Sequence, residues 1–362
     1  MMTSHHQEAS ALRTFDHSHM FEVLYSFPQQ VREALAIGRQ APYFHDTSHF
    51  PMLLFCGMGG SAIAGDLLRC LVQAYEIDDF FVHVHRTYGI PSGISSSTAV
   101  IASSYSGNTE ETLTAYRAAR SKTHRLLCIT TGGELQRLAH ADGVPVISIP
   151  SGLQPRCALG YSFVPVIMTL LTHNAFNHQS TATLLRALDT LPEFLETTVQ
   201  AYSVPIAQNP AYTLAERLHG TIPVIYSSSL LEAVNLRWRG QLQENAKHLA
   251  FGNSIPEMNH NEINSWVLPR LMLQNFTIIF LHAPQRGQQS RMDVRMQATK
   301  NVLQGRPKNL IDIVAEGTTL LEQMFHLLVL ADWTSYWLAL LNQQDPTEIS
   351  DITALKQAMA QH

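Results

Sequence analysis

Two short segments carry residue types that bind an anion, and each follows an apolar run. The first is Gly57-Met58-Gly59-Gly60-Ser61, directly after the run Leu53–Cys56. Glycines there let backbone N–H groups approach a ligand closely, and a helix that begins at the turn adds a favourable dipole. The second is Ser103–Thr112, in which Gly107 and Asn108 can bend the chain. That turn would gather three hydroxyl side chains: Ser104, Ser106 and Thr109.

Neither segment matches a common nucleotide-binding motif. GMGGS lacks the GxGxxG spacing of a dinucleotide site, no acidic residue ends the next strand, and no GK[ST] follows as in a Walker A loop. Because hydroxyls neutralise little charge, the pair suits a phosphate monoester on a sugar better than a triphosphate with magnesium. The alternative for the glycine segment is a turn that serves tight packing only. Thr109 is also a candidate N-cap, with Glu111 or Thr112 in the first turn.

The elements that must position these segments alternate between strand and helix. A helical pattern runs from Met20 to Ile37 and is interrupted by Pro28. Short apolar runs predict strands at Leu53–Cys56, Thr98–Ala102 and the segments FFVHVHR, RLLCITTGG and VPVISIP. Helical stretches separate several of them, at Thr109–Ser121 and Glu134–His140. This alternation is typical of βαβ units around a parallel sheet covered on both faces.

The same alternation restarts in the second half of the chain. Strands are predicted at IPVIYSS, FTIIFLH and LIDIVA. Helices are predicted at Ala211–His219, Leu230–Leu249, Gln289–Leu303, Thr318–Asn342 and Ile349–Ala360. The charge-poor region 172–185 and a helical segment to about residue 209 would link the two halves. We therefore expect two α/β domains, residues 1–180 and 181–362.

Composition agrees with two globular domains and limits the partners. The chain has 362 residues, of which 45% are hydrophobic and 15% charged, so it can bury two cores and is neither disordered nor a coiled coil. The formal net charge is −5 and no run is rich in Lys or Arg, so nothing predicts binding to nucleic acid or an anionic membrane. A low fraction of charged residues beside a high fraction of hydrophobic residues suggests that some surface is buried in an oligomer.

Cysteine spacing and hydropathy indicate a soluble, cytoplasmic protein. The first 20 residues have no apolar core of the kind a secretory signal needs. Residues Cys157–Leu185 carry no charge, but their apolar part, Phe163–Leu171, is far shorter than the ~20 residues that span a bilayer. The cysteines form no CxxC pair, which argues against a disulfide framework and a zinc knuckle. The four are Cys56, Cys70, Cys128 and Cys157.

Several motifs together resemble a known family. GMGGSAIAGD and SYSGNTEETL resemble the sugar isomerase (SIS) domain, whose hydroxyl-rich loop holds the phosphate of a phosphosugar. GLQPRCALGYSFVP, RWRGQLQENAKHLAFGNSIPEMNHNEI and DPTEISDITALK are similar to the bifunctional phosphoglucose/phosphomannose isomerase family, and the likeness runs from about Met20 to Lys356. The resemblance implies two SIS-type doubly wound parallel-sheet domains, each an αβα sandwich. The residues implied to bind the substrate are Gly59, Gly60, Ser61, Ser104, Ser106 and Thr109.

The resemblance also implies roles for Glu244 and His260. Glu244 matches the family's base, and a carboxylate can carry one proton between adjacent sugar carbons. Without the family, a glutamate on a solvated helix face is the ordinary alternative. His260 matches a histidine that opens the sugar ring in the neighbouring subunit's site, which implies a homodimer. The alternatives are a surface histidine or a metal ligand beside Glu257 or Glu262, although HNE offers two ligands at most.

Arg156 and Lys356 complete the implied catalytic set. Arg156 follows the predicted strand VPVISIP at its carboxyl end, where ligands lie in doubly wound sheets. A fixed guanidinium there can offset charge on an enediolate, while the alternative is a salt-bridged loop arginine. Lys356 matches a lysine that reaches the ring oxygen, although by spacing alone it is a surface residue. Two features depart from the family: an extra polar N-terminus and the 88 residues that separate Arg156 from Glu244 (244 − 156).

Together these residues imply an enzyme that converts glucose 6-phosphate, and also mannose 6-phosphate, reversibly to fructose 6-phosphate. The reaction would pass through a cis-enediol and need no metal or cofactor. Acceptance of both epimers rests on the resemblance alone. A different class is an SIS sensor that binds a phosphosugar and regulates a partner, but no basic recognition helix precedes Leu53. A third is another SIS isomerase or an amidotransferase half, for which an N-terminal nucleophilic cysteine is missing.

Overall fold

The computed structural model describes residues 12–77, 79–176, 178–203, 208–284, 290–359 and 361. Its contacts divide the chain into two compact units. We call residues 26–196 the N-terminal unit, and residues 197–362 with the described residues before 26 the C-terminal unit. The domain limits 1–180 and 181–362 stay a prediction.

The N-terminal unit contains a five-stranded parallel sheet of order β2-β1-β3-β4-β5. Its strands are β1 (Met52–Cys56), β2 (Phe81–His85), β3 (Thr98–Ser103), β4 (Leu126–Thr130) and β5 (Val146–Ser148). The central strands β3 and β4 are buried along their whole length. Both faces of a parallel sheet are covered, which is why these strands appear in the sequence as continuous apolar runs.

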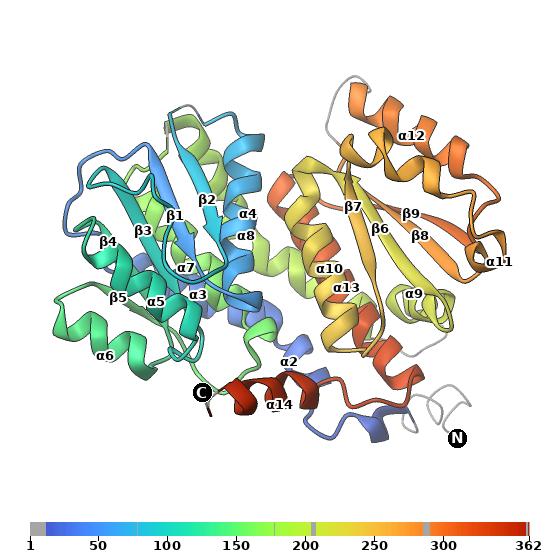
Figure 1. The fold of residues 1–362 in the computed structure, drawn as a ribbon, viewed down its shortest axis with the longest axis horizontal. Coiled ribbons are helices and arrows are strands. Elements are labelled where there is room, and N and C mark those ends of the chain that lie inside the picture. Colours follow the sequence, from blue (N-terminus) through green and yellow to red (C-terminus); the bar gives the residue numbers. More distant parts are fainter. Residues whose placement is uncertain are drawn as a thin grey trace. The chain divides into compact units, whose positions relative to one another are not determined.

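Helices cover both faces of this sheet (Figure 1). They are α3 (Phe27–Gln40), α4 (Gly59–Ala74), α5 (Glu110–Arg120), α6 (Gly133–Ala141), α7 (Leu159–Thr172) and the part of α8 (His178–Ser203) up to residue 196, with a short 3-10 turn η2 (Pro155–Cys157). On one face, Leu54, Val100 and Cys128 pack beneath Tyr116 of α5. On the other face, Phe55 lies against α4 so closely that a Cβ at Gly65 would come 2.6 Å from its ring. The unit is therefore an αβα sandwich.

The C-terminal unit repeats this plan with a four-stranded parallel sheet of order β7-β6-β8-β9. Its strands are β6 (Ile222–Ser228), β7 (Phe251–Ile255), β8 (Phe276–His282) and β9 (Asn309–Val314). Its helices are α2 (Met20–Tyr25), α9 (Pro210–Leu218), α10 (Glu232–Glu244), α11 (Arg270–Leu273), α12 (Arg291–Leu303), α13 (Leu320–Leu341) and α14 (Ser350–Met359). Short 3-10 turns are η1 (Arg13–Phe15), η4 (Ser229–Leu231), η5 (Glu257–His260) and η6 (Glu262–Ser265). The predicted fold class, two doubly wound parallel-sheet domains, is confirmed.

Helix α13 forms the centre of the C-terminal unit. Among the described residues it is the one helix long and apolar enough to cross a membrane, yet 94% of its apolar window is buried inside the protein. Trp333, Tyr336 and Trp337 lie within this buried surface and contact one another edge-on or at a tilt. Such burial is typical of the core helix of a globular domain.

Helix α10 and two unpredicted elements, β7 and α7, differ from the sequence prediction. The predicted helix Leu230–Leu249 is shorter, because α10 ends at Glu244 and Lys247 then adopts a left-handed backbone with φ of +51°. Strand β7 was not predicted, since FGNSI is a polar edge strand without an apolar run. Helix α7 was not predicted either, because nearly all of its residues are buried and it shows no polar face.

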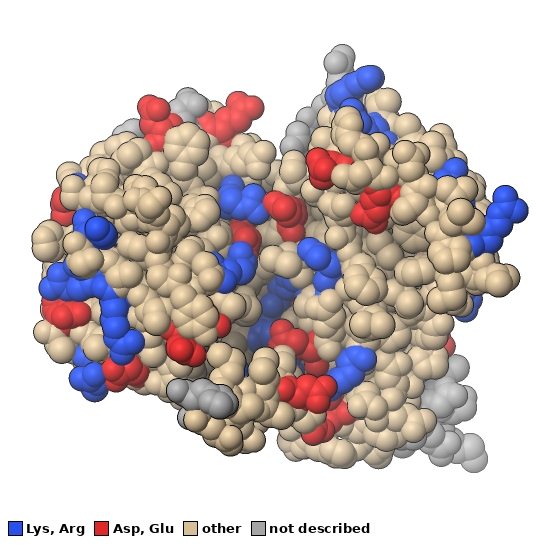
Figure 2. Space-filling view, viewed as in Figure 1, with Lys and Arg blue, Asp and Glu red and all other residues tan. Residues whose placement is uncertain are grey.

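Charge is sparse and mixed on the surface. Over the N-terminal unit, the face in Figure 2 shows Lys and Arg side chains among Asp and Glu side chains, with most atoms belonging to other residues.

Candidate active site

The strand order of the N-terminal unit indicates the sheet edge at which a ligand would bind. The chain passes from β1 outward to β2 and then returns to β3 on the other side of β1. In such sheets ligands bind outside the carboxyl ends of the two strands where the order reverses. The segments that follow β1 and β3 are the two anion-binding candidates, Gly57–Ser61 and Ser103–Thr112. The fold therefore brings both to one edge of one sheet.

The glycine loop is shaped by close backbone packing. Gly59 has φ of +47°, a left-handed conformation that favours glycine. A Cβ at Gly60 would come 2.8 Å from the backbone of Pro155 and from the backbone nitrogen of Arg156. Helix α4 begins at Gly59, so its first N–H groups lie in this loop. The glycines thus serve both close packing and an open helix N-terminus.

The serine loop holds its hydroxyls in a small network. Ser104 is buried, and its Oγ lies 2.9 Å from Thr109 Oγ1. Ser106 Oγ is exposed and accepts a hydrogen bond from the backbone N–H of Asn108 at 3.2 Å. Thr109 occupies the predicted N-cap position of α5, but its side chain makes no capping hydrogen bond. Its hydroxyl is directed to Ser104 instead.

Hydrogen bonds join the two loops. Ser103 Oγ donates to the carbonyl of Ser61 at 2.9 Å, and the backbone N–H of Tyr105 donates to Ser61 Oγ at 3.0 Å. Ser61 therefore links α4 to the serine loop. The arrangement places neutral hydroxyls and the N-termini of α4 and α5 at one edge of the sheet, which suits a phosphate group.

A third segment, Thr131–Gly133 after β4, packs against the serine loop and was not singled out in the sequence. Thr131 Oγ1 donates to the carbonyl of Tyr105 at 2.8 Å, and the backbone N–H of Glu134 donates to Asn108 Oδ1 at 3.0 Å. Gly107 has φ of +71°, and a Cβ there would collide with the carbonyl of Gly132. The signal was the TTGG that ends the run RLLCITTGG, another glycine turn at a strand end.

Arg156 lies in η2 and is only 2% exposed. An arginine this buried is rare in proteins unless its charge is compensated. Its segment is attached to the serine loop through Tyr105, whose Oη accepts from the backbone N–H of Leu153 at 2.9 Å and donates to the carbonyl of Pro150 at 3.1 Å. Burial raises the pKa of Tyr105, so its hydroxyl stays protonated and can donate. The backbone of Arg156 thus lies beside the glycine loop and is held there.

Glu244, His260 and Lys356 belong to the C-terminal unit and lie on three separate elements. Glu244 is half-buried and is the last residue of α10. His260 is exposed and ends the turn η5, as expected for a segment predicted to be a loop or helix start. Lys356 is exposed on α14, none of whose described residues is buried. The assigned roles of these three residues stay a prediction.

The segment that carries His260 is fastened by Glu262. Both carboxylate oxygens of Glu262 accept hydrogen bonds, one from Tyr226 Oη on β6 and the other from Asn253 Nδ2 on β7 at 2.8 Å. Trp266 Nε1 donates to the same Tyr226 oxygen at 2.8 Å. Burial, and then the hydrogen bond to Glu262, raise the pKa of Tyr226, so the phenol remains a donor. These two hydrogen bonds hold the carboxylate of Glu262, and with it the start of η6, against β6 and β7.

Comparison with known proteins identifies the family. The model for the bacterial phospho-glucose isomerase C-terminal SIS domain matches residues 207–359. A bifunctional phosphoglucose/phosphomannose isomerase from Caldicellulosiruptor bescii is 39% identical over 352 residues, which are 94% of this chain and 99% of that protein. The chain belongs to the bifunctional phosphoglucose/phosphomannose isomerase family. The resemblance drawn from the sequence motifs is confirmed.

Other members and structures of the family's fold agree. A bifunctional phosphoglucose/phosphomannose isomerase from Aquifex aeolicus is 31% identical over 319 residues, covering 88% of this chain and 93% of that protein. The C-terminal domain of glucosamine-fructose-6-phosphate aminotransferase from Francisella tularensis superposes with a TM-score of 0.72 at 13% identity, over 93% of this chain and 99% of that one. At this identity the superposition shows the shared fold only.

Proposed function

We propose that this protein catalyses the reversible isomerisation of glucose 6-phosphate and mannose 6-phosphate to fructose 6-phosphate. The observation that supports it most is the hydroxyl-lined edge of the N-terminal sheet, in a chain that aligns with named isomerases over nearly its whole length. That edge offers neutral donors and helix N-termini, which bind a phosphate already attached to a sugar. Gly59, Gly60, Ser61, Ser104, Ser106 and Thr109 would hold this phosphate.

The proposed chemistry is proton transfer through a cis-enediol. Glu244 would take the proton from C2 and return it at C1, and His260 would move the proton that opens the sugar ring. The guanidinium of Arg156 would offset the negative charge on the enediolate oxygens. Lys356 would assist at the ring oxygen. Glucose and mannose 6-phosphate differ only at C2, which becomes planar in the enediol, so one site can process both.

The proposal includes a second copy of the chain. His260 is exposed on the protomer, and in the family resemblance it serves the site of its neighbour. A homodimer would give this exposed imidazole its function. The same proposal puts the protein in the cytoplasm, and the four cysteines, which are buried and form no disulfide with one another, are consistent with it.

A coupled assay tests the proposal. Purified protein is given glucose 6-phosphate or mannose 6-phosphate in the presence of EDTA, and fructose 6-phosphate is followed. We expect turnover of both epimers with the chelator present. Activity that disappears with EDTA and returns with zinc would contradict the metal-free mechanism. Tight phosphosugar binding with no turnover of either epimer would instead favour the sensor class.

A further inference from the structure

Polar side chains at four-residue spacing lead along α10 to Glu244. Arg237 and Gln241 lie on α10, and Asn245 follows its last residue. Residues four apart on a helix lie on the same face, so these three side chains form one row. All three are buried. Buried polar side chains in a row are unusual on a helix that could pack by apolar contacts alone.

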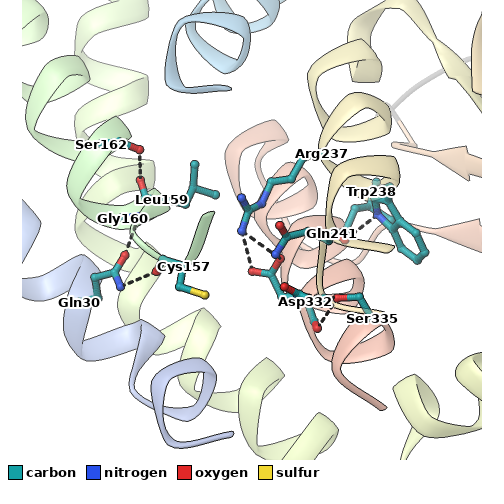
Figure 3. A network of polar contacts seen from close by, with 12 residues as sticks. Gln30, Cys157, Leu159, Gly160, Ser162, Arg237, Trp238, Gln241, Asp332 and Ser335 are labelled. Atoms are coloured by element: carbon teal, nitrogen blue, oxygen red, sulfur yellow. Dashed lines mark hydrogen bonds and ion pairs between the residues drawn. The ribbon is translucent and has the colours of Figure 1, made fainter. Parts of the chain in front are cut away.

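The row pairs with α13. Asp332 accepts hydrogen bonds from Arg237 Nη2, at 2.9 and 3.0 Å, and from Gln241 Nε2 at 2.6 Å (Figure 3). Asn245 Nδ2 donates to Ser335 Oγ at 3.0 Å, and Ser335 Oγ donates to the carbonyl of Asp332 at 2.8 Å. We call these five residues the α10–α13 seam. Every turn of α10 from Arg237 onward is thereby fixed to α13.

The residues after Glu244 are fastened to the end of α13 and beyond it. Asn342 Nδ2 donates to the carbonyl of Ala246 at 2.9 Å. Lys247 has a left-handed backbone. Its Nζ donates to the carbonyl of Asn245 at 3.1 Å and to the carbonyl of Asp345. His248 Nε2 donates to the carbonyl of Thr221 at 2.5 Å. The chain on both sides of Glu244 is therefore held by side-chain hydrogen bonds.

Stability alone does not account for such a seam. A buried ion pair such as Arg237–Asp332 loses solvation on burial, and apolar residues of similar volume often hold two helices as firmly. What hydrogen-bonded pairs add is a single register, because a helix turned by one residue, about 100°, would leave every donor unmatched. The seam therefore sets the direction in which α10 presents Glu244.

We propose that the α10–α13 seam consists of positioning residues that fix the rotation of α10 and so aim the carboxylate of Glu244 at the sugar. This inference rests on the proposed function, in which Glu244 is the base. Ser335→Ala tests the seam without changing any charge. It removes the hydroxyl that accepts a hydrogen bond from Asn245. The neighbouring Thr334 offers a matched control, because its buried hydroxyl has no hydrogen-bond partner among the described residues and Thr334→Val keeps its shape.

Two measurements test the seam on the full chain. In the coupled assay, Ser335→Ala should lower kcat about tenfold and leave KM within about twofold, since a misplacement of about 1 Å at a reacting group can cost about 100-fold in rate. Ser335→Thr should restore kcat, and Thr334→Val should match the wild type. In hydrogen–deuterium exchange, peptides covering residues 240–250 should exchange faster in Ser335→Ala only.

The outcomes separate the seam from the proposed function. Ser335→Ala with a lowered melting temperature, unchanged kcat and unchanged exchange at residues 240–250 would overturn the positioning role. An equal fall of kcat in Thr334→Val would overturn it as well. If the wild type isomerises no hexose phosphate, the proposed function fails, and the exchange data alone then decide whether the seam holds the segment around Glu244.

Discussion

Replacing Gly60 with alanine should push the glycine loop and the segment that carries Arg156 apart. The added Cβ would come 2.8 Å from the backbone of Pro155 and from the backbone nitrogen of Arg156. Ordinary carbon contacts begin at 3.4 Å, so 3.4 − 2.8 = 0.6 Å has to be gained. Both sides of the contact are backbone, and neither can move aside by a rotamer change.

The expected magnitudes follow from that displacement. Overpacking of this kind costs about 1–3 kcal/mol of unfolding free energy. For a unit of this size, each kcal/mol lowers the melting temperature by about 2–4 °C, which gives a loss of roughly 2–12 °C. Since a misplacement of about 1 Å can cost about 100-fold in rate, a shift of this size at Arg156 should lower kcat about tenfold or more.

The coupled assay and a thermal melt measure both effects. Gly93→Ala is the matched control, because Gly93 has an ordinary backbone and, in the part of the chain that the structure describes, no atom lies within 4 Å of its added Cβ. That variant should keep the wild-type kcat and melting temperature. A Gly60→Ala enzyme that also kept both values would refute the close packing of the glycine loop on the Arg156 segment.

Three further predictions concern single side chains. Thr109→Val removes a hydroxyl that contacts Ser104. Loss of one hydrogen bond to a phosphate should raise KM about 10- to 100-fold in the coupled assay. An unchanged KM would exclude Thr109 from the phosphate site. Glu262→Ala removes the acceptor of Tyr226 and Asn253 and so loosens the segment that carries His260. We expect kcat to fall while inorganic phosphate still inhibits as in the wild type. A kcat equal to that of the wild type would show that this segment does not need Glu262. Burial lowers the pKa of His326 below its ordinary 6.5, so the unfolded chain binds this proton at a higher pH than the folded chain does. The unfolding free energy should therefore fall as pH drops below 6.5. Urea titrations should show a smaller fall of the unfolding free energy over this pH range in His326→Gln than in the wild type. An equal fall in the two proteins would contradict this.

Local sequence signals were enough for most of the N-terminal unit. Short apolar runs located β1, β3 and β4, because central parallel strands are buried on both faces. The order of loops along the chain then placed Ser61 and Ser104 at the same sheet edge, where the structure joins them through Tyr105. Glycines and hydroxyls at strand ends are local features, and they were readable without the fold.

Features that depend on packing between distant segments could not be predicted from the sequence. Thr109 stands at an N-cap position, yet its hydroxyl turns to Ser104, a choice that only the folded loop decides. Just after α10 ends at Glu244, Asn245 donates to Ser335 of α13, which lies 90 residues later in the chain. Strand β7 is polar and pairs at a sheet edge, so it produced no hydrophobic pattern. Such long-range contacts leave little trace in a local window of sequence.

The roles of Glu244, His260, Arg156 and Lys356 came from motif resemblance rather than from residue chemistry. A single carboxylate at a helix end, such as Glu244, is ordinarily a solvated side chain. What distinguishes it in the structure is the set of buried and partly buried hydrogen bonds on both sides of it. Figure 3 shows the hydrogen bonds that precede Glu244, from Arg237 and Gln241 of α10 to Asp332 of α13.

The base role of Glu244 is tested most directly by Glu244→Gln, assayed on both aldose phosphates with EDTA present. The amide keeps the size of the side chain but cannot accept the C2 proton, so kcat should fall by orders of magnitude while phosphosugar binding stays close to the wild type. A Glu244→Gln protein that turns over glucose 6-phosphate at the wild-type rate would contradict the proposed mechanism at its centre.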